Sequence, residues 1–159
     1  MRIVSLVPSA SEIICQLGSE DFLVAVSHEC NYPVSLNRLP IVTSSNVSSS
    51  LPQKEIDNLV RDKVNNNLPL YQIDNEVINN ANPDKIITQG VCNVCAISES
   101  QVEATLKGQL CTLSTDTEII SLNGRSFNGI CKDIEILGIK LNKEKAVSYT
   151  HLTLPTKVT

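Results

Sequence analysis

The chain opens with Arg2-Ile-Val-Ser-Leu-Val-Pro-Ser-Ala-Ser-Glu12, and this stretch decides the fold. Ile3–Val7 is a continuous apolar run, which is typical of a strand buried on both faces of a parallel sheet. Ser9-Ala-Ser-Glu12 then has the spacing of a capping box, in which Ser9 caps a helix that carries Ile13 and Ile14. Gly18 is placed to end that helix. The opening therefore predicts a strand followed directly by a helix.

The same unit recurs along the chain. Capping boxes at Ser50 and Ser98 predict two further helices, and apolar residues spaced by three and four from Phe127 to Leu141 predict another. Asp74 begins a short helix that ends at Pro83-Asp84. The remaining strands are expected at Leu23–Ser27, Pro40–Thr43, Lys85–Gln89, Leu110–Leu113 and Glu118–Leu122. Alternating strands and helices indicate an α/β fold, with a mostly parallel sheet flanked by helices in the Rossmann-like manner.

Composition excludes two kinds of partner. The 159 residues carry 13 basic and 17 acidic side chains, for a formal net charge of −4, and no basic run. Protein surfaces that bind nucleic acids are usually strongly basic, so no nucleic-acid partner is expected. The longest apolar stretches, such as Phe22–Val26, are far shorter than a spanning helix, so no membrane insertion is expected.

The parallel sheet predicts where a ligand binds. Ligands of open parallel sheets lie beyond the carboxyl ends of the strands. Four loops should meet at that edge: Pro8–Ser9, Ser27–Pro33, Ser44–Ser50 and Thr88–Ser98. They contain the unusual polar residues of the chain, among them His28 and Glu29. His28 is as readily a hydrogen-bonded loop residue as a ligand, and Ser9 either caps its helix or presents the helix amides to an anionic part of a ligand.

Cysteines supply a second candidate site. Cys92-Asn-Val-Cys95 is a C-x-x-C motif in a loop after a strand, and Cys30 with His28 lies on a neighbouring loop. Three thiolates and an imidazole suit zinc, copper(I) or iron, so Cys30, Cys92 and Cys95 are candidate metal ligands. A redox dithiol and simple packing remain alternatives. Cys15, Cys111 and Cys131 lie on apolar faces and are expected to be small buried hydrophobes, and no disulfide framework is expected.

Three segments together resemble a known family. Arg2–Glu12, Val26-Ser-His-Glu-Cys-Asn-Tyr-Pro33 and Asn82-Pro-Asp-Lys-Ile-Ile-Thr-Gln89 resemble the iron-siderophore and cobalamin group of periplasmic binding proteins, the substrate-binding components of ABC importers. The resemblance runs from residue 1 to about residue 146. It implies a helical-backbone (class III) binding protein with two α/β lobes joined by a long helix, of which this chain would hold the first lobe. It also implies a ligand cleft between the lobes, and no catalysis.

The resemblance also implies site residues. The loop Glu29–Tyr32, the region near Ser45, and Gln89 would line the cleft, and Ser9 and His28 join them as ligand-binding candidates. Cobalamin binders place aromatic side chains against the corrin, whereas this chain keeps Tyr32 alone and has Glu29, Ser45 and Gln89 at the other places. The implied ligand is cobalamin, another corrinoid or an iron chelate. Glu76 falls where the family carries a carboxylate that pairs with the permease, the implied partner.

An alternative function stays open at this point. A cytoplasmic metal-, haem- or redox-handling module would use Cys30, Cys92 and Cys95. A hydrolase is disfavoured, because no serine elbow or phosphate loop is present. The family resemblance implies the periplasm or cell envelope, while the sequence as written shows no export signal and so indicates the cytoplasm.

The chain divides into three parts by pattern. Residues 1–125 are expected to form the α/β ligand-binding lobe, and residues 126–146 a helix and the start of the interlobe helix. Residues 147–159 resemble a translated sequencing adapter and are expected to be non-native, so the natural protein would be longer and include a second lobe.

Overall fold

The structure is a computed structural model that describes residues 1–66, 68–90, 97, 99–106 and 116–153. The predicted strand Leu110–Leu113 and the predicted cap at Ser98 lie outside the described residues.

Four parallel strands form the central sheet, in the order β2-β1-β5-β6. They are β1 (Ile3–Ser5), β2 (Leu23–Val26), β5 (Lys85–Gln89) and β6 (Glu118–Leu122). β1 and β5 occupy the centre, with Ile3 opposite Lys85 and Ser5 opposite Ile87. This architecture confirms the predicted α/β fold with a parallel sheet.

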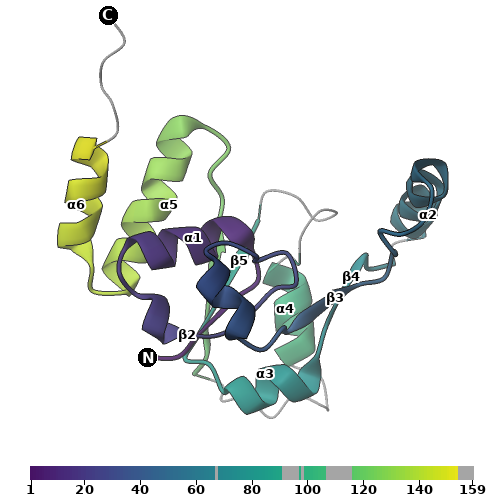
Figure 1. The fold of residues 1–159 in the computed structure, drawn as a ribbon, viewed down its shortest axis with the longest axis horizontal. Helices are drawn as coiled ribbons and strands as arrows, with labels where there is room; N and C mark the ends of the chain where they lie inside the picture. The colour runs from purple at the N-terminus through teal and green to yellow at the C-terminus, as the bar shows by residue number, and fades with distance from the viewer. Residues whose placement is uncertain (67, 91–96, 98, 107–115, 154–159) are drawn as a thin grey trace, which may run out of the picture.

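Helices cover both faces of the sheet (Figure 1). On one face lie α1 (Pro8–Gln16), α5 (Phe127–Lys140) and α6 (Glu144–Thr153), packed on Ile3, Ile87 and Ile120. On the other lie α3 (Asn75–Ala81) and α4 (Glu99–Leu106), packed on Val4 and Ile86. Neighbouring residues of one strand enter opposite cores because side chains alternate across a sheet. Among the described helices, none is long and apolar enough to cross a membrane.

A small arm projects from this body. Its base is an antiparallel pair, β3 (Thr43–Ser45) and β4 (Tyr71–Ile73), and its tip is α2 (Gln53–Asn65). Figure 1 shows α2 far from the other helices. The strand expected at Pro40–Thr43 was wrong in its bounds, because Ile41 forms only a single bridge to Val26 and the paired residues begin at Thr43.

Two of the predicted helix caps were wrong for the same reason, a nearby proline. α1 begins at Pro8, one residue before Ser9, and its N-cap is Val7 with no side-chain cap hydrogen bond. α2 has Pro52 as N-cap in place of Ser50. Proline fits a helix start because its missing N–H would have no partner there and its φ is already helical.

Other predicted boundaries are confirmed. Asp74 caps α3 by accepting from the backbone N–H groups of Glu76 and Val77. Gly18 follows α1 with a φ of +67°, a left-handed conformation that glycine adopts without strain. Short 3₁₀ turns at Glu20–Phe22 and Val34–Arg38 connect the elements around β2.

The C-terminal helix extends beyond the predicted change of pattern. α6 runs from Glu144 to Thr153, past Ala146, and Val147 is buried against α5. A Cβ on Gly138 would lie 2.2 Å from Val147 Cγ2, so α5 and α6 can meet this closely only because residue 138 is glycine. The division at residues 125 and 146, and the adapter origin of residues 147–159, stay predictions.

Candidate functional site

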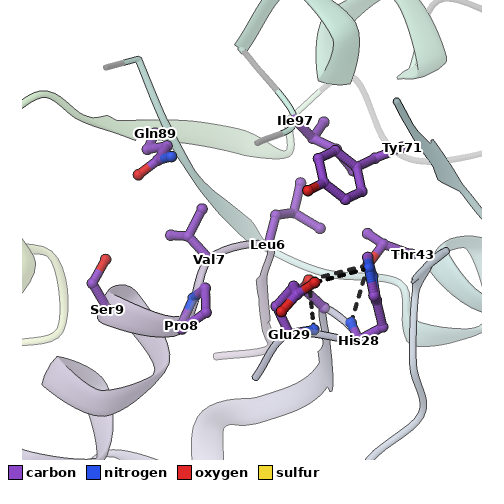
Figure 2. A pocket seen from close by; sticks show the side chains of 11 residues that line it. Leu6, Val7, Pro8, Ser9, His28, Glu29, Thr43, Tyr71, Gln89 and Ile97 are labelled. Atoms are coloured by element: carbon purple, nitrogen blue, oxygen red, sulfur yellow. Dashed lines mark hydrogen bonds and ion pairs between the residues drawn. The ribbon is translucent and has the colours of Figure 1, made fainter. Parts of the chain in front are cut away.

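A small pocket lies at the carboxyl ends of β1, β2 and β5, where the sheet topology places a ligand (Figure 2). Its volume is about 80 Å³. The lining residues come from the loop after β1, the loop after β2, the arm strands and the end of β5. They are Leu6, Val7, Pro8, Ser9, Ser27, His28, Glu29, Thr43, Tyr71, Gln89 and Ile97.

Four of the predicted site residues meet in this pocket. Ser9 lies in the first turn of α1, His28 and Glu29 follow β2, and Gln89 ends β5. In Figure 2, Ser9 and Gln89 flank one side of the pocket, while His28 and Glu29 form the other. Residues separated by up to 80 positions are brought together because parallel strands end at one edge.

Hydrogen bonds hold His28 against the base of the arm. Its backbone N–H donates to Thr43 Oγ1 at 3.1 Å, and its Nδ1 lies 2.7 Å from the same oxygen. Thr43 Oγ1 in turn donates to Ser27 Oγ at 3.1 Å. Thr43 is buried, so these bonds are shielded from water and fix the ring.

Glu29 stands beside the histidine ring. Its Oε1 lies 3.4 Å from His28 Nε2, and its side chain is 60% exposed. The backbone N–H of Glu29 donates to Ser27 Oγ at 3.3 Å, which holds the loop backbone while the carboxylate remains on the surface. The pocket therefore has a fixed imidazole next to an exposed carboxylate.

Apolar side chains complete the wall. The Tyr71 ring lies 5.5 Å from the His28 ring, tilted by 44°. Ile97 is buried beside it, and its carbonyl accepts a hydrogen bond from the Thr88 hydroxyl. Tyr71 and Thr43 were missed by the sequence analysis. Thr43 was expected to end a strand of the main sheet, and the strand containing Tyr71 was not predicted.

Three predicted residues lie outside this pocket. Tyr32 is 59% exposed, in the same loop as Glu29. Ser45 is exposed on β3, where its hydroxyl donates to the Val47 carbonyl at 2.9 Å. Glu76 is exposed in the first turn of α3.

Cys30 does not face the pocket. It is 5% exposed and accepts a hydrogen bond from the buried Ser11 hydroxyl, with 3.1 Å between Oγ and Sγ. Burial raises the pKa of the Cys30 thiol, against the smaller effect of the bond from Ser11, so the neutral thiol is favoured over the thiolate that binds metals.

The proposed cysteine site is only partly described. Cys92 and Cys95 lie outside the described residues, as does Cys111, while Cys15 and Cys131 are free and half-buried. Within the described part of the chain, no group of three histidine, cysteine or acidic side chains could hold a metal ion. A metal site built from Cys30, Cys92 and Cys95 therefore stays a prediction.

A second hollow, of about 300 Å³, lies between α1 and α5. Its apolar lining residues are Ile13, Leu17, Ile130 and Ile134, and its polar lining residues are Ser9, Glu12 and Gln16. This groove is larger but has few polar groups to orient a ligand. The smaller pocket is the better candidate, since binding sites combine an apolar wall with a few converging polar groups.

The chain is similar in structure to several solved proteins. Its fold is that of the periplasmic substrate-binding proteins for haem and vitamin B12. A periplasmic heme-binding protein from Pseudomonas aeruginosa superposes with a TM-score of 0.65 and 18% identity, over 95% of this chain and 42% of that one. The periplasmic heme-binding protein HutB of Vibrio cholerae superposes with a TM-score of 0.62 and 19% identity, over 99% of this chain and 51% of that one.

The periplasmic vitamin B12 binding protein BtuF of Vibrio cholerae gives a TM-score of 0.59 and 24% identity, over 95% of this chain and 47% of that one. The chain thus spans about half the length of these structures. No protein-family model and no curated protein sequence matches it.

Proposed function

We propose that this chain is a ligand-binding lobe of the substrate-binding component of an ABC importer, and that it carries out no catalysis. The ligand proposed is an iron chelate such as haem, or a corrinoid. The observation that carries the proposal is the pocket at the carboxyl edge of the sheet, in a fold whose solved examples are named as haem and vitamin B12 binders.

The size of the pocket indicates that it is one part of a larger site. Pockets for drug-sized ligands measure about 300 to 1,000 Å³, and the pocket here measures about 80 Å³. A macrocycle would therefore either lie across the pocket mouth or place only one edge inside. Its remaining surface would need contacts from elsewhere, which fits a chain about half as long as its structural neighbours.

The lining residues suggest separate roles. Leu6, Val7 and Ile97 would contact the apolar face of the ligand, while Ser9 and Gln89 would bond to polar substituents at its edge. Tyr32 lies in the loop after β2 and Ser45 is the last residue of β3. Both are exposed, so they would reach only the periphery of a large ligand. The exposed carboxylate of Glu76 would pair with a basic residue of the permease.

Ligand titration tests the proposal. Absorbance of haemin and of aquocobalamin should change saturably with the 159-residue chain at micromolar concentrations. Gln89→Trp should abolish the change by filling the pocket, while Lys54→Trp, which adds the same bulk to exposed α2, should have no effect. If neither ligand binds, or if Gln89→Trp binds as well as wild type, the proposal fails.

The permease contact has its own test. Glu76→Arg should leave both titrations unchanged and lower the ATPase stimulation of the importer in vesicles. Glu55→Arg, an acidic residue of the first turn of α2, is the matched control. Equal stimulation by the two variants would remove Glu76 from the interface.

A further inference from the structure

The arm presents an apolar helix face that the body of the protein does not cover. α2 contains no buried residue, and Figure 1 shows it far from the other helices. Its Leu59 and Val64 are 38% and 41% exposed, and Ile56 and Val60 are half-buried. Spacings of three and four residues place these side chains on one side of the helix. An amphipathic helix gains most of its stability when a partner covers its apolar side.

The side chains about Val60 are arranged symmetrically. Ile56 and Val64 lie four residues before and after it, and both are apolar and β-branched, as Val60 is. Asp57 and Lys63 lie three residues before and after it and carry opposite charges. Steps of three and four residues from one position stay on the same face of a helix, so all five side chains share one strip. These five residues are called the α2 strip.

The α2 strip is complementary to a second copy of itself in the antiparallel direction. In a pair related by a two-fold axis at Val60, Ile56 of one copy meets Val64 of the other, and Asp57 meets Lys63. Each contact occurs twice because the axis exchanges the two copies. A parallel pair would instead place Asp57 beside Asp57 and Lys63 beside Lys63, and like charges repel.

The two charges of the α2 strip are accessible for these contacts. Asp57 pairs with Arg61 of the same helix at 3.1 Å, but the two side chains are 58% and 72% exposed. Such an exposed pair contributes little to stability, so Asp57 can pair with Lys63 of another copy at small cost. The Lys63 ammonium has no ion-pair partner among the described residues.

We infer that α2 is a dimerisation helix, and that its partner is α2 of a second copy of this chain, packed antiparallel about Val60. The inference does not rest on the proposed function. The 13 residues of α2 span about 20 Å, so the interface is short and the dimer is expected to be weak and concentration-dependent. The pocket lies at the base of the arm and α2 at its tip, so each copy keeps its own ligand site.

Sedimentation velocity of the 159-residue chain tests the inference. The average mass should rise toward that of a dimer between micromolar and submillimolar concentrations. Val60→Glu places two carboxylates together at the two-fold axis and should keep the chain monomeric throughout this range. Asn58→Glu, which adds the same charge to the opposite face of α2, should dimerise as wild type does.

A charge exchange tests the direction of pairing. Asp57→Lys and Lys63→Asp should each weaken dimerisation by about 10-fold or more, because each replaces two attractive contacts by two repulsive ones. The double variant D57K/K63D carries the two charges in exchanged positions, so antiparallel contacts are attractive again and the dimer should return. A parallel pair would be repulsive at both positions before and after the double change.

Three results would overturn the inference. A chain that stays monomeric at submillimolar concentration has no such interface. A dimer that Val60→Glu forms as readily as wild type has its interface elsewhere in the molecule. A double variant as weak as the single variants contradicts antiparallel pairing of Asp57 with Lys63. None of these measurements uses a ligand, so a failure of the proposed function in the titrations leaves the inference standing.

Discussion

Two helices with the same apolar spacing, α5 in the body and α2 in the arm, end in opposite environments. α5 buries Leu137 and presents Ile134 to the core. α2 has no buried residue, and its Leu59 and Val64 are 38% and 41% exposed. An amphipathic pattern thus predicts that a helix has an apolar face. Whether that face is buried depends on the position of the strands that flank the helix in the chain. α5 follows β6, a strand of the main sheet, and packs on that sheet. α2 instead connects β3 and β4, the two strands of the arm, and lies away from the sheet.

The comparison predicts that stability resides in the body. Ile87, in the central strand β5, is fully buried. Ile87→Ala should lower the free energy of unfolding by about 2 to 5 kcal/mol, through lost burial and the cavity left behind. Leu59→Ala in α2 should cost less than about 1 kcal/mol. Urea denaturation measures both, and equal losses would show that the arm is packed as tightly as the body.

A buried polar cluster in the body should give the next largest effect. The Ser11 hydroxyl donates to Ser5 Oγ at 2.8 Å and also contacts Cys30 Sγ, and all three residues are buried. Ser11→Ala removes a hydrogen-bond partner from Ser5 Oγ and from Cys30 Sγ, which should lower the free energy of unfolding by about 1 to 3 kcal/mol. Ser48→Ala removes an exposed hydroxyl near the arm and should be neutral. Equal denaturation midpoints for the two variants would contradict this expectation.

The junction between arm and body should show a smaller effect. Asp74 follows β4 and caps α3 through two backbone N–H groups, at 2.9 and 3.0 Å. Asp74→Ala should lower stability by about 1 kcal/mol, while Asp74→Asn, which keeps a capping oxygen, should recover most of it. Thermal unfolding followed by circular dichroism would show this order, and a fully destabilised Asn variant would mean that the negative charge rather than the cap matters.

The smallest effect is expected from a surface ion pair and depends on pH. Hydrogen bonds from Lys140 and then Lys85 lower the pKa of Glu118 from its usual 4.5. A lowered pKa in the folded state stabilises the protein above the unfolded pKa, and the contribution is lost as pH falls through the folded pKa. Glu118 is partly exposed, so Glu118→Gln should cost only about 0.5 kcal/mol at pH 7.

The difference between wild type and Glu118→Gln should shrink below pH 4.5 as the carboxylate protonates. Urea denaturation at pH 7 and at pH 3 gives the comparison. Glu12→Gln, on the exposed surface of α1, serves as a control for the general effect of removing one negative charge. A gap that widens toward low pH would contradict the assigned direction of the pKa shift.

Most of the body could be predicted from local pattern. The strand at Ile3–Val7, the strand at Lys85–Gln89 and the cap at Asp74 each carry a signal within a few residues. The positions of Ser9, His28, Glu29 and Gln89 at one edge followed from the rule that parallel strands end together. The helix starts lie at Pro8, the first residue of α1, and at Pro52, the N-cap of α2, because a capping-box pattern does not include the effect of a proline at a helix start.

The pairing of the arm could not be predicted. Thr43 and Tyr71 are 28 positions apart, and their strands run antiparallel across an inserted helix, so neither shows its partner in the sequence. Cys30 shows the same limit, since its position in the loop beside His28 suggested a metal ligand and only its packing against Ser11 shows that it faces inward. These are long-range contacts, which depend on register and on the direction of a side chain from its strand.

The sequence by itself determined the α/β class, the strands and helices of the body, and the edge of the sheet at which unusual polar residues gather, because each of these follows from short-range spacing. Only the tertiary structure decided that α2 leaves the body, that Cys30 is enclosed, and that Thr43 binds Nδ1 of His28 and leaves Nε2 unpaired in the pocket. The reason is physical: periodicity records which face of an element is apolar, whereas a hydrogen-bond network depends on atoms from distant segments meeting within about 3 Å.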